Sequence, residues 1–199
     1  MQRLQAIAAE ISRVGAIVGG AMLLIASIVI CIDITLRYTL SLTLGGADEL
    51  SGYALAISSA WGFSAALLHR SHIRIDTVYV RLKSVTARAL LDLASLATLL
   101  FFFGMVTFYA WGVVRQSWVA DSHSLSEMEV PLILPQGLWF AGLLFFVLLC
   151  LLVMARALLA FAQGRYRDLF ALIGSKSAVE EAEEEIAATQ HGLEQEKDK

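Results

Sequence analysis

The stretch VGAIVGGAMLLIASIVICI, residues 14–32, carries no formal charge. Three further stretches share this property: residues 50–68, 93–114 and 130–155. A helix needs about 20 apolar residues to cross about 30 Å of hydrocarbon. The composition agrees, because 58% of the chain is hydrophobic and 17% is charged, against about 25% charged in soluble domains. The sequence therefore predicts an all-α integral membrane protein with four transmembrane helices.

The fourth uncharged stretch is longer than one span and contains two prolines, Pro131 and Pro135. In a continuous helix the ring of Pro135 would clash with the carbonyl of residue 131. We therefore expect 130–134 to be an extended or re-entrant entry. The predicted spans are about 14–36, 50–68, 93–114 and 135–156.

The flanking segments complete the predicted organisation. Residues 1–13 place apolar side chains at helical spacing, which indicates an interfacial leader helix. The four-helix transmembrane domain covers 14–160. Residues 161–199 form a cytoplasmic tail, and its last part, 175–199, holds eight acids against three lysines. Such a charged segment has no core of its own to fold around.

Basic residues give the orientation. With the N-terminus inside, the outer loops carry only Arg37 and Arg115. The cytoplasmic segments near the membrane carry ten: Arg3, Arg13, Arg70, Arg74, Arg81, Lys83, Arg88, Arg156, Arg165 and Arg167. Cytoplasmic loops are enriched in Lys and Arg. This distribution predicts that both termini are cytoplasmic.

The loop between the second and third spans contains a second amphipathic segment. From residue 75 to about 90, apolar residues recur every three or four positions. Arg74, Arg81 and Arg88 are spaced seven apart and border this apolar face. The pattern predicts an interfacial helix over about 75–90, with arginines that contact lipid phosphates.

The segment HRSHIRID, residues 69–76, begins this loop and allows two interpretations. His69, His72 and Asp76 would share one helical face, as metal ligands could. However, Arg70 and Arg74 lie between them and would repel a cation. We favour a membrane-surface elbow in which Asp76 caps the interfacial helix, and we expect no metal site.

Two acidic sites lie near the predicted outer side. Asp33 is enclosed by an apolar run, so it is a candidate proton or sodium site. It also precedes Arg37 by four residues, the favourable order for a helical ion pair, and we favour a structural pair near the interface. Asp48 and Glu49 stand where a helix N-terminus favours negative charge.

Small residues recur every four positions along the second span: Gly52, Ala56, Ala60 and Ser64. Such a stripe lets another helix approach closely. The partner could be another subunit or a neighbouring helix of the same bundle. Trp61, in the middle of the span, would fill a gap at this contact.

Several functional classes lack their residues. No histidine lies within a span, as a membrane haem would require, and there is neither a P-loop nor a nucleophile elbow. Cys31 and Cys150 lie in apolar runs, as packing thiols do. We therefore expect no enzyme activity, no cofactor and no nucleic-acid partner.

The order of these features resembles the small membrane subunit of TRAP transporters, the DctQ type, over about residues 14–160. The matching motifs are Arg37–Tyr38, Asp48–Glu49–Leu50, His72 with Ile73 and Asp76, and the two prolines Pro131 and Pro135. Gly45–Gly46 replaces a tryptophan that the family often has before the acidic pair.

The resemblance implies a function that depends on partners in a bacterial inner membrane. A large permease subunit of DctM type would carry the sodium-coupled solute path, and a periplasmic protein would deliver a solute, typically a carboxylate. This chain would support and anchor the large subunit among membrane lipids. Two alternatives remain open: an anchor subunit of a redox enzyme, and a small homo-oligomeric channel or exporter.

Overall fold

The computed structural model describes residues 2–70, 84–126 and 128–174, and every regular element in these ranges is a helix. The helices are α1 (Gln2–Leu40), α2 (Ala47–Leu68), α4 (Val85–Val119), α5 (Ile133–Ala162) and α6 (Tyr166–Ile173). An isolated β-bridge joins His123 to Pro131 in the loop between α4 and α5. The predicted all-α class is confirmed for the described part of the chain.

Three of the described helices are long and apolar enough to cross a membrane, over Ile7–Leu40, Val85–Val119 and Ile133–Ala162. α2 forms where the second span was predicted but does not reach the same hydropathy. Its apolar residues are interrupted by serines, namely Ser51, Ser58, Ser59 and Ser64. A fourth crossing by α2 therefore stays a prediction.

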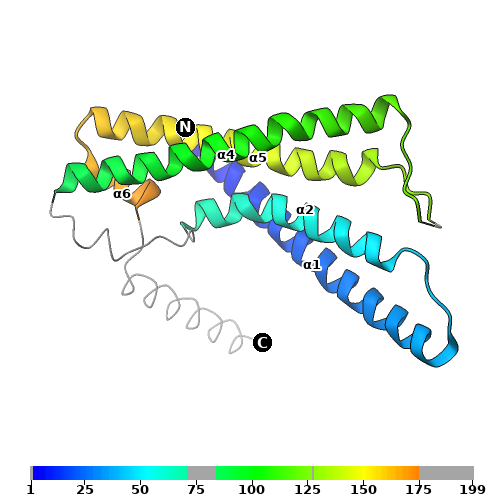
Figure 1. The fold of residues 1–199 in the computed structure, drawn as a ribbon. Coiled ribbons are helices and arrows are strands. Elements are labelled where there is room, and N and C mark those ends of the chain that lie inside the picture. Colours follow the sequence, from blue (N-terminus) through cyan, green and yellow to red (C-terminus); the bar gives the residue numbers. More distant parts are fainter. Residues whose placement is uncertain (1, 71–83, 127, 175–199) are drawn as a thin grey trace, which may run out of the picture.

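The helices form two hairpins, α1–α2 and α4–α5, which meet where α2 packs against α5 (Figure 1). The short helix α6 packs against α4 and α5. Away from the junction the hairpins diverge, so that the C-terminal end of α1 lies far from α4 and α5 (Figure 1). Below, the end with the 41–46 and 120–132 loops is called the loop end, and the opposite end is called the α6 end.

Aromatic rings form the centre of the junction. Phe103 of α4 and Phe146 of α5 meet edge to face, with ring centroids 4.7 Å apart. Phe63 of α2 lies 4.9 Å from Phe103 in the same geometry. Edge-to-face pairs of this kind contribute roughly 0.5–1.5 kcal/mol beyond simple burial. These three rings therefore join α2, α4 and α5.

The buried face of α1 is made mainly of small residues. Ala8, Ser12, Gly19, Ala26 and Asp33 are buried, and they follow one another at steps of four and then seven. Residues at such steps lie in one stripe along a helix. The rest of α1 exposes large aliphatic side chains, as a helix that faces lipid requires.

The predicted leader is not a separate element. α1 runs without interruption from Gln2 to Leu40, so that residues 1–13 and the first span belong to one helix apart from Met1, which lies outside the described residues. No proline separates the two segments, and Glu10 pairs with Arg13 at 3.2 Å just before the predicted boundary. An i,i+3 pair of this kind is compatible with a continuous helix.

The predicted interfacial helix over 75–90 is wrong at its C-terminal part. Ser84 is extended (φ −86°, ψ 124°), and its hydroxyl accepts a hydrogen bond from the Ala87 backbone N–H at 3.4 Å. A serine in this geometry is an N-cap, so residues 85–90 belong to α4. Residues 71–83 lie outside the described residues, and the rest of this prediction with them.

The entry to α5 also differs from expectation. The helix begins at Ile133, two residues before the predicted start, and ends at Ala162 instead of residue 156. Pro135 stands in the first turn, where its missing N–H costs no intrahelical hydrogen bond. Pro131 lies before the helix, so the clash expected at its carbonyl does not arise.

The start of the predicted tail belongs to the folded bundle. Leu169 and Ile173 of α6 are buried. The Arg70 guanidinium donates to the Phe170 carbonyl at 3.2 Å, which ties the end of α2 to α6. The prediction of one tail over 161–199 is therefore wrong for residues 161–174. Residues 175–199 lie outside the described residues.

Candidate functional site

Asp33 is the most enclosed polar group among the described residues of the loop end. Its side chain is 3% exposed, and Oδ2 accepts from the Arg37 guanidinium at 2.7 Å. Oδ1 accepts from the Thr43 hydroxyl at 3.0 Å and from the Leu44 backbone N–H at 2.7 Å. The sequence predicted the partner one turn away but not the two in the loop. Both carboxylate oxygens therefore hold parts of the same chain.

Glu49 connects the two loops of this end. Gly46 takes the N-cap position of α2 without a side-chain hydrogen bond, and Asp48 and Glu49 lie in the first turn, as predicted. The Ser126 hydroxyl, followed by those of Tyr53 and Ser124, stabilises the Glu49 carboxylate and holds its pKa below the ordinary value. An acid of α2 is thus bound by the loop between α4 and α5.

The backbone of the 41–46 loop also touches the 120–132 loop directly. Gly46 has φ +136°, and a Cβ built there would lie 2.5 Å from the sulfur of Met128. Only glycine suits both the conformation and the space. Gly46 therefore makes a close contact between the two loops.

α1 and α2 approach each other closely where α1 has glycines. A Cβ at Gly19 would lie 3.0 Å from the Cα of Ser58, and the Ser58 hydroxyl donates to the Gly19 carbonyl at 2.8 Å. A Cβ at Gly15 would lie 2.8 Å from the ring of Trp61. Glycine allows two helix backbones to approach in this way. Gly20, on another side of α1, has open space.

The predicted stripe on α2 divides into two parts. Ala60 and Ser64 are 1% and 0% exposed inside the bundle, whereas Gly52 and Ala56 are exposed. Trp61 lies between them and reaches α5. The structure therefore places half of the stripe against the chain's own helices and leaves the other half uncovered.

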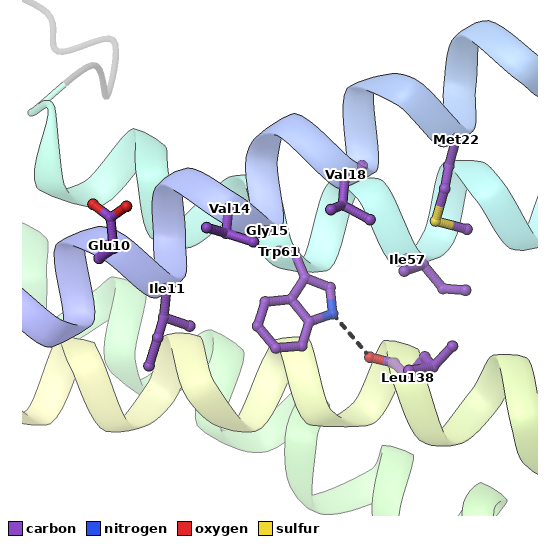
Figure 2. Close-up of a pocket in the computed structure, with 10 residues that line it drawn as sticks. Glu10, Ile11, Val14, Gly15, Val18, Met22, Ile57, Trp61 and Leu138 are labelled. Carbon is purple, nitrogen blue, oxygen red and sulfur yellow. Dashed lines mark hydrogen bonds between the residues drawn. The ribbon is translucent and has the colours of Figure 1, made fainter.

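Trp61 fills the space between α1 and α5 (Figure 2). Its Nε1–H donates to the Leu138 carbonyl at 3.1 Å, and its ring stacks on Phe145 with centroids 5.8 Å apart. A Cβ at Gly142 would lie 2.9 Å from the indole. Gly15 and Gly142 therefore make the room that one large residue occupies.

Charged residues gather at the α6 end, and Asp92 among them was not predicted from the sequence. Asp92 of α4 is 1% exposed, four residues after the half-buried Arg88. Arg156 of α5 is half-buried, with Nη1 fully enclosed. The sequence could have indicated Asp92, because it follows Arg88 by four residues in ARALLD, residues 87–92, just before the uncharged run 93–114.

Most of the HRSHIRID segment lies outside the described residues. His69 is exposed at the end of α2, and Arg70 is partly buried. The other predicted residues of this motif lie outside the described ranges: His72, Arg74 and Asp76, with Arg81 of the basic stripe. In the described ranges no three His, Cys, Asp or Glu side chains converge as metal ligands. The elbow itself stays a prediction.

The two polar loops of the loop end thus contact each other. The helices are packed through small and aromatic side chains. No curated protein and no solved structure matches the chain. A family described as tripartite ATP-independent periplasmic transporters, DctQ component, matches residues 26–163. This region covers more than two thirds of the chain, from Ala26 in the C-terminal part of α1 to the end of α5. The chain belongs to the DctQ family, the small membrane component of TRAP transporters.

Proposed function

We propose that this chain supports and anchors the large permease subunit of a sodium-coupled solute uptake system and does not itself form the solute path. The observation that carries this proposal is the use of its polar groups. Both oxygens of the buried Asp33 bind the chain's own Arg37, Thr43 and Leu44. The carboxylate is thus engaged as a structural anchor, whereas a coupling ion would need its oxygens.

The same proposal includes α2 as a fourth crossing. α2 is 22 residues long, about 33 Å at the helical rise, and it packs against two apolar helices, α1 and α5. Its serines need no lipid contact where they face the bundle, as Ser58 and Ser64 do. In this arrangement both termini are cytoplasmic and the loop end is periplasmic, where a solute-binding protein delivers its ligand.

The exposed half of the α2 stripe is the proposed contact with the large subunit. Gly52 and Ala56 are uncovered small residues of α2, about two turns and one turn before the buried Ala60. Ala60 and Ser64, predicted as part of the same surface, are buried in the bundle and act there as packing residues.

Co-purification tests this contact. Ala56→Leu should release the large subunit and abolish uptake while the chain still inserts, because a leucine prevents close helix approach. Ala97→Leu, the same change at an exposed position of α4, should preserve both. Unchanged complex and uptake in Ala56→Leu would show that this face of α2 is not the contact.

Thiol labelling tests the orientation. A cysteine at Ser122, in the loop end, should react with an impermeant reagent in intact cells after Cys31 has been replaced by serine. A cysteine at Ser175 should react only after lysis. The ratio of ten basic residues to two underlies this expectation. Labelling of Ser175 in intact cells would reverse the topology.

A further inference from the structure

An apolar groove lies between the N-terminal half of α1, the middle of α2 and the first turns of α5 (Figure 2). Its volume is about 470 Å³, within the range of roughly 300–1,000 Å³ of small-molecule sites. The groove is lined by Glu10, Ile11, Val14, Gly15, Val18, Gly19, Met22, Ile57, Trp61 and Leu138. Apart from Glu10, these residues present hydrocarbon, a thioether or an indole.

The polar atoms of the groove floor are already bonded. The Trp61 Nε1–H donates to the Leu138 carbonyl (Figure 2), and the Gly19 carbonyl accepts from the Ser58 hydroxyl. A water in such a place would lack the 2–4 polar partners that buried water needs. The groove therefore suits a hydrocarbon ligand.

The length of the groove corresponds to one leaflet. Its α1 lining runs from Glu10 to Met22, about 18 Å at the helical rise. One leaflet contributes about 15 Å, half of the hydrocarbon thickness. Beyond Met22, α1 continues to Leu40 with exposed aliphatic side chains that do not line the groove. A helix crossing the whole membrane would need a longer groove, whereas one acyl chain would not.

Glu10 is the charged residue of the groove lining, and Arg13, which pairs with it, lies outside that lining. Glu10 and Arg13 pair at 3.2 Å, and their side chains are 61% and 70% exposed. A carboxylate beside a guanidinium complements a zwitterion, because the guanidinium binds phosphate and the carboxylate binds an ammonium. A phosphoethanolamine headgroup carries these two charges in adjacent positions.

We propose that this groove binds one acyl chain of a phosphatidylethanolamine molecule whose headgroup contacts Glu10 and Arg13. The lipid would fill the gap between the two hairpins in the leaflet at the N-terminal end of α1. Trp61 would be the wall of the site on the α2 side. This site is independent of the α2 surface proposed for the large subunit.

Filling the groove tests the proposal. In Val18→Trp the indole would occupy the groove, because Val18 lines it. Ile17→Trp is the matched control, because Ile17 is 62% exposed and does not line the groove. Native mass spectrometry of the detergent-purified chain should find one bound phosphatidylethanolamine in the wild type and in the control. Bound lipid should fall about tenfold in Val18→Trp.

A second measurement covers the case in which Val18→Trp fails to fold. Phosphatidylethanolamine with a diazirine in its acyl chain, photolysed with the wild-type chain, should label peptides that contain residues 11–22 and Trp61. Glu10→Gln should also raise the bound ratio of phosphatidylglycerol to phosphatidylethanolamine, because the partner of the ammonium is lost.

Three outcomes would overturn the proposal. Equal lipid in Val18→Trp and Ile17→Trp would mean that only annular lipid is present. Photolabelling spread evenly over α1 would mean the same. Release of the large subunit by Val18→Trp, with the lipid retained, would assign the groove to a partner helix.

Discussion

The two helices of each hairpin pack in opposite ways in the two hairpins. α1 packs closely on α2 because Gly15 and Gly19 have no side chains, which leaves room for Trp61 and Ser58. α4 and α5 interlock through large rings, such as Phe103 with Phe146, and the glycines of α4, Gly104 and Gly112, have open space. One contact should therefore be sensitive to added volume and the other to removed volume.

Removing volume from the α4–α5 hairpin should have the largest effect. Phe146 is 0% exposed, and Phe146→Ala leaves a cavity that should lower the free energy of unfolding by about 3 kcal/mol. Phe101→Ala, at a 73% exposed position of α4, should change it little. Unfolding in mixed micelles with increasing denaturing detergent measures both. Equal effects would mean that the ring cluster is not the centre of the hairpin junction.

Adding volume to the α1–α2 hairpin should have the next largest effect. A Cβ at Gly19 meets the Ser58 backbone at 3.0 Å, and a backbone cannot move aside as a side chain can. Gly19→Leu should therefore lower the free energy of unfolding by about 2 kcal/mol. Gly20→Leu, with nothing within 4 Å, is the control for helix propensity and hydrophobicity. If Gly19→Leu and Gly20→Leu lower the free energy of unfolding equally in this assay, close packing at Gly19 does not stabilise the α1–α2 hairpin.

These differences explain which features the sequence could predict. Uncharged runs and the step of three to four residues depend on local chemistry, so they located α1, α2, α4 and α5. The stripe of Gly52, Ala56, Ala60 and Ser64 predicted a close contact, but a stripe of small residues does not identify its partner. Ala60 therefore lies inside the bundle while Ala56, one turn away, is exposed.

Features that depend on distant residues were not predictable. α6 is only eight residues long, and its packing on α4 and α5 depends on helices that are distant in the sequence. The contact of Glu49 with Ser124 and Ser126 joins residues more than seventy positions apart. Asp92 differs from a surface acid only through the helices that bury it. The Asp33–Arg37 pair, in contrast, depends on helical spacing alone and was predicted.

The smallest expected effect concerns the loop of the α1–α2 hairpin. Asp33 holds this loop through Thr43 and Leu44 as well as pairing with Arg37. Arg37 has a 59% exposed side chain, and exposed ion pairs contribute little. The loop hydrogen bonds should therefore matter more than the charge. Asp33→Asn keeps an oxygen acceptor for the loop, whereas Asp33→Leu removes it.

Limited trypsin digestion separates the two contributions, because trypsin cleaves after Arg37 in the solubilised protein. Cleavage there should accelerate strongly in Asp33→Leu and only slightly in Asp33→Asn. Cleavage after Arg115, in the other hairpin, should stay constant in both variants and serves as the internal reference. If Asp33→Asn is cleaved as fast as Asp33→Leu, the ion pair holds the end of α1. The α1–α2 hairpin would then depend on charge at its loop, in addition to close packing along its length.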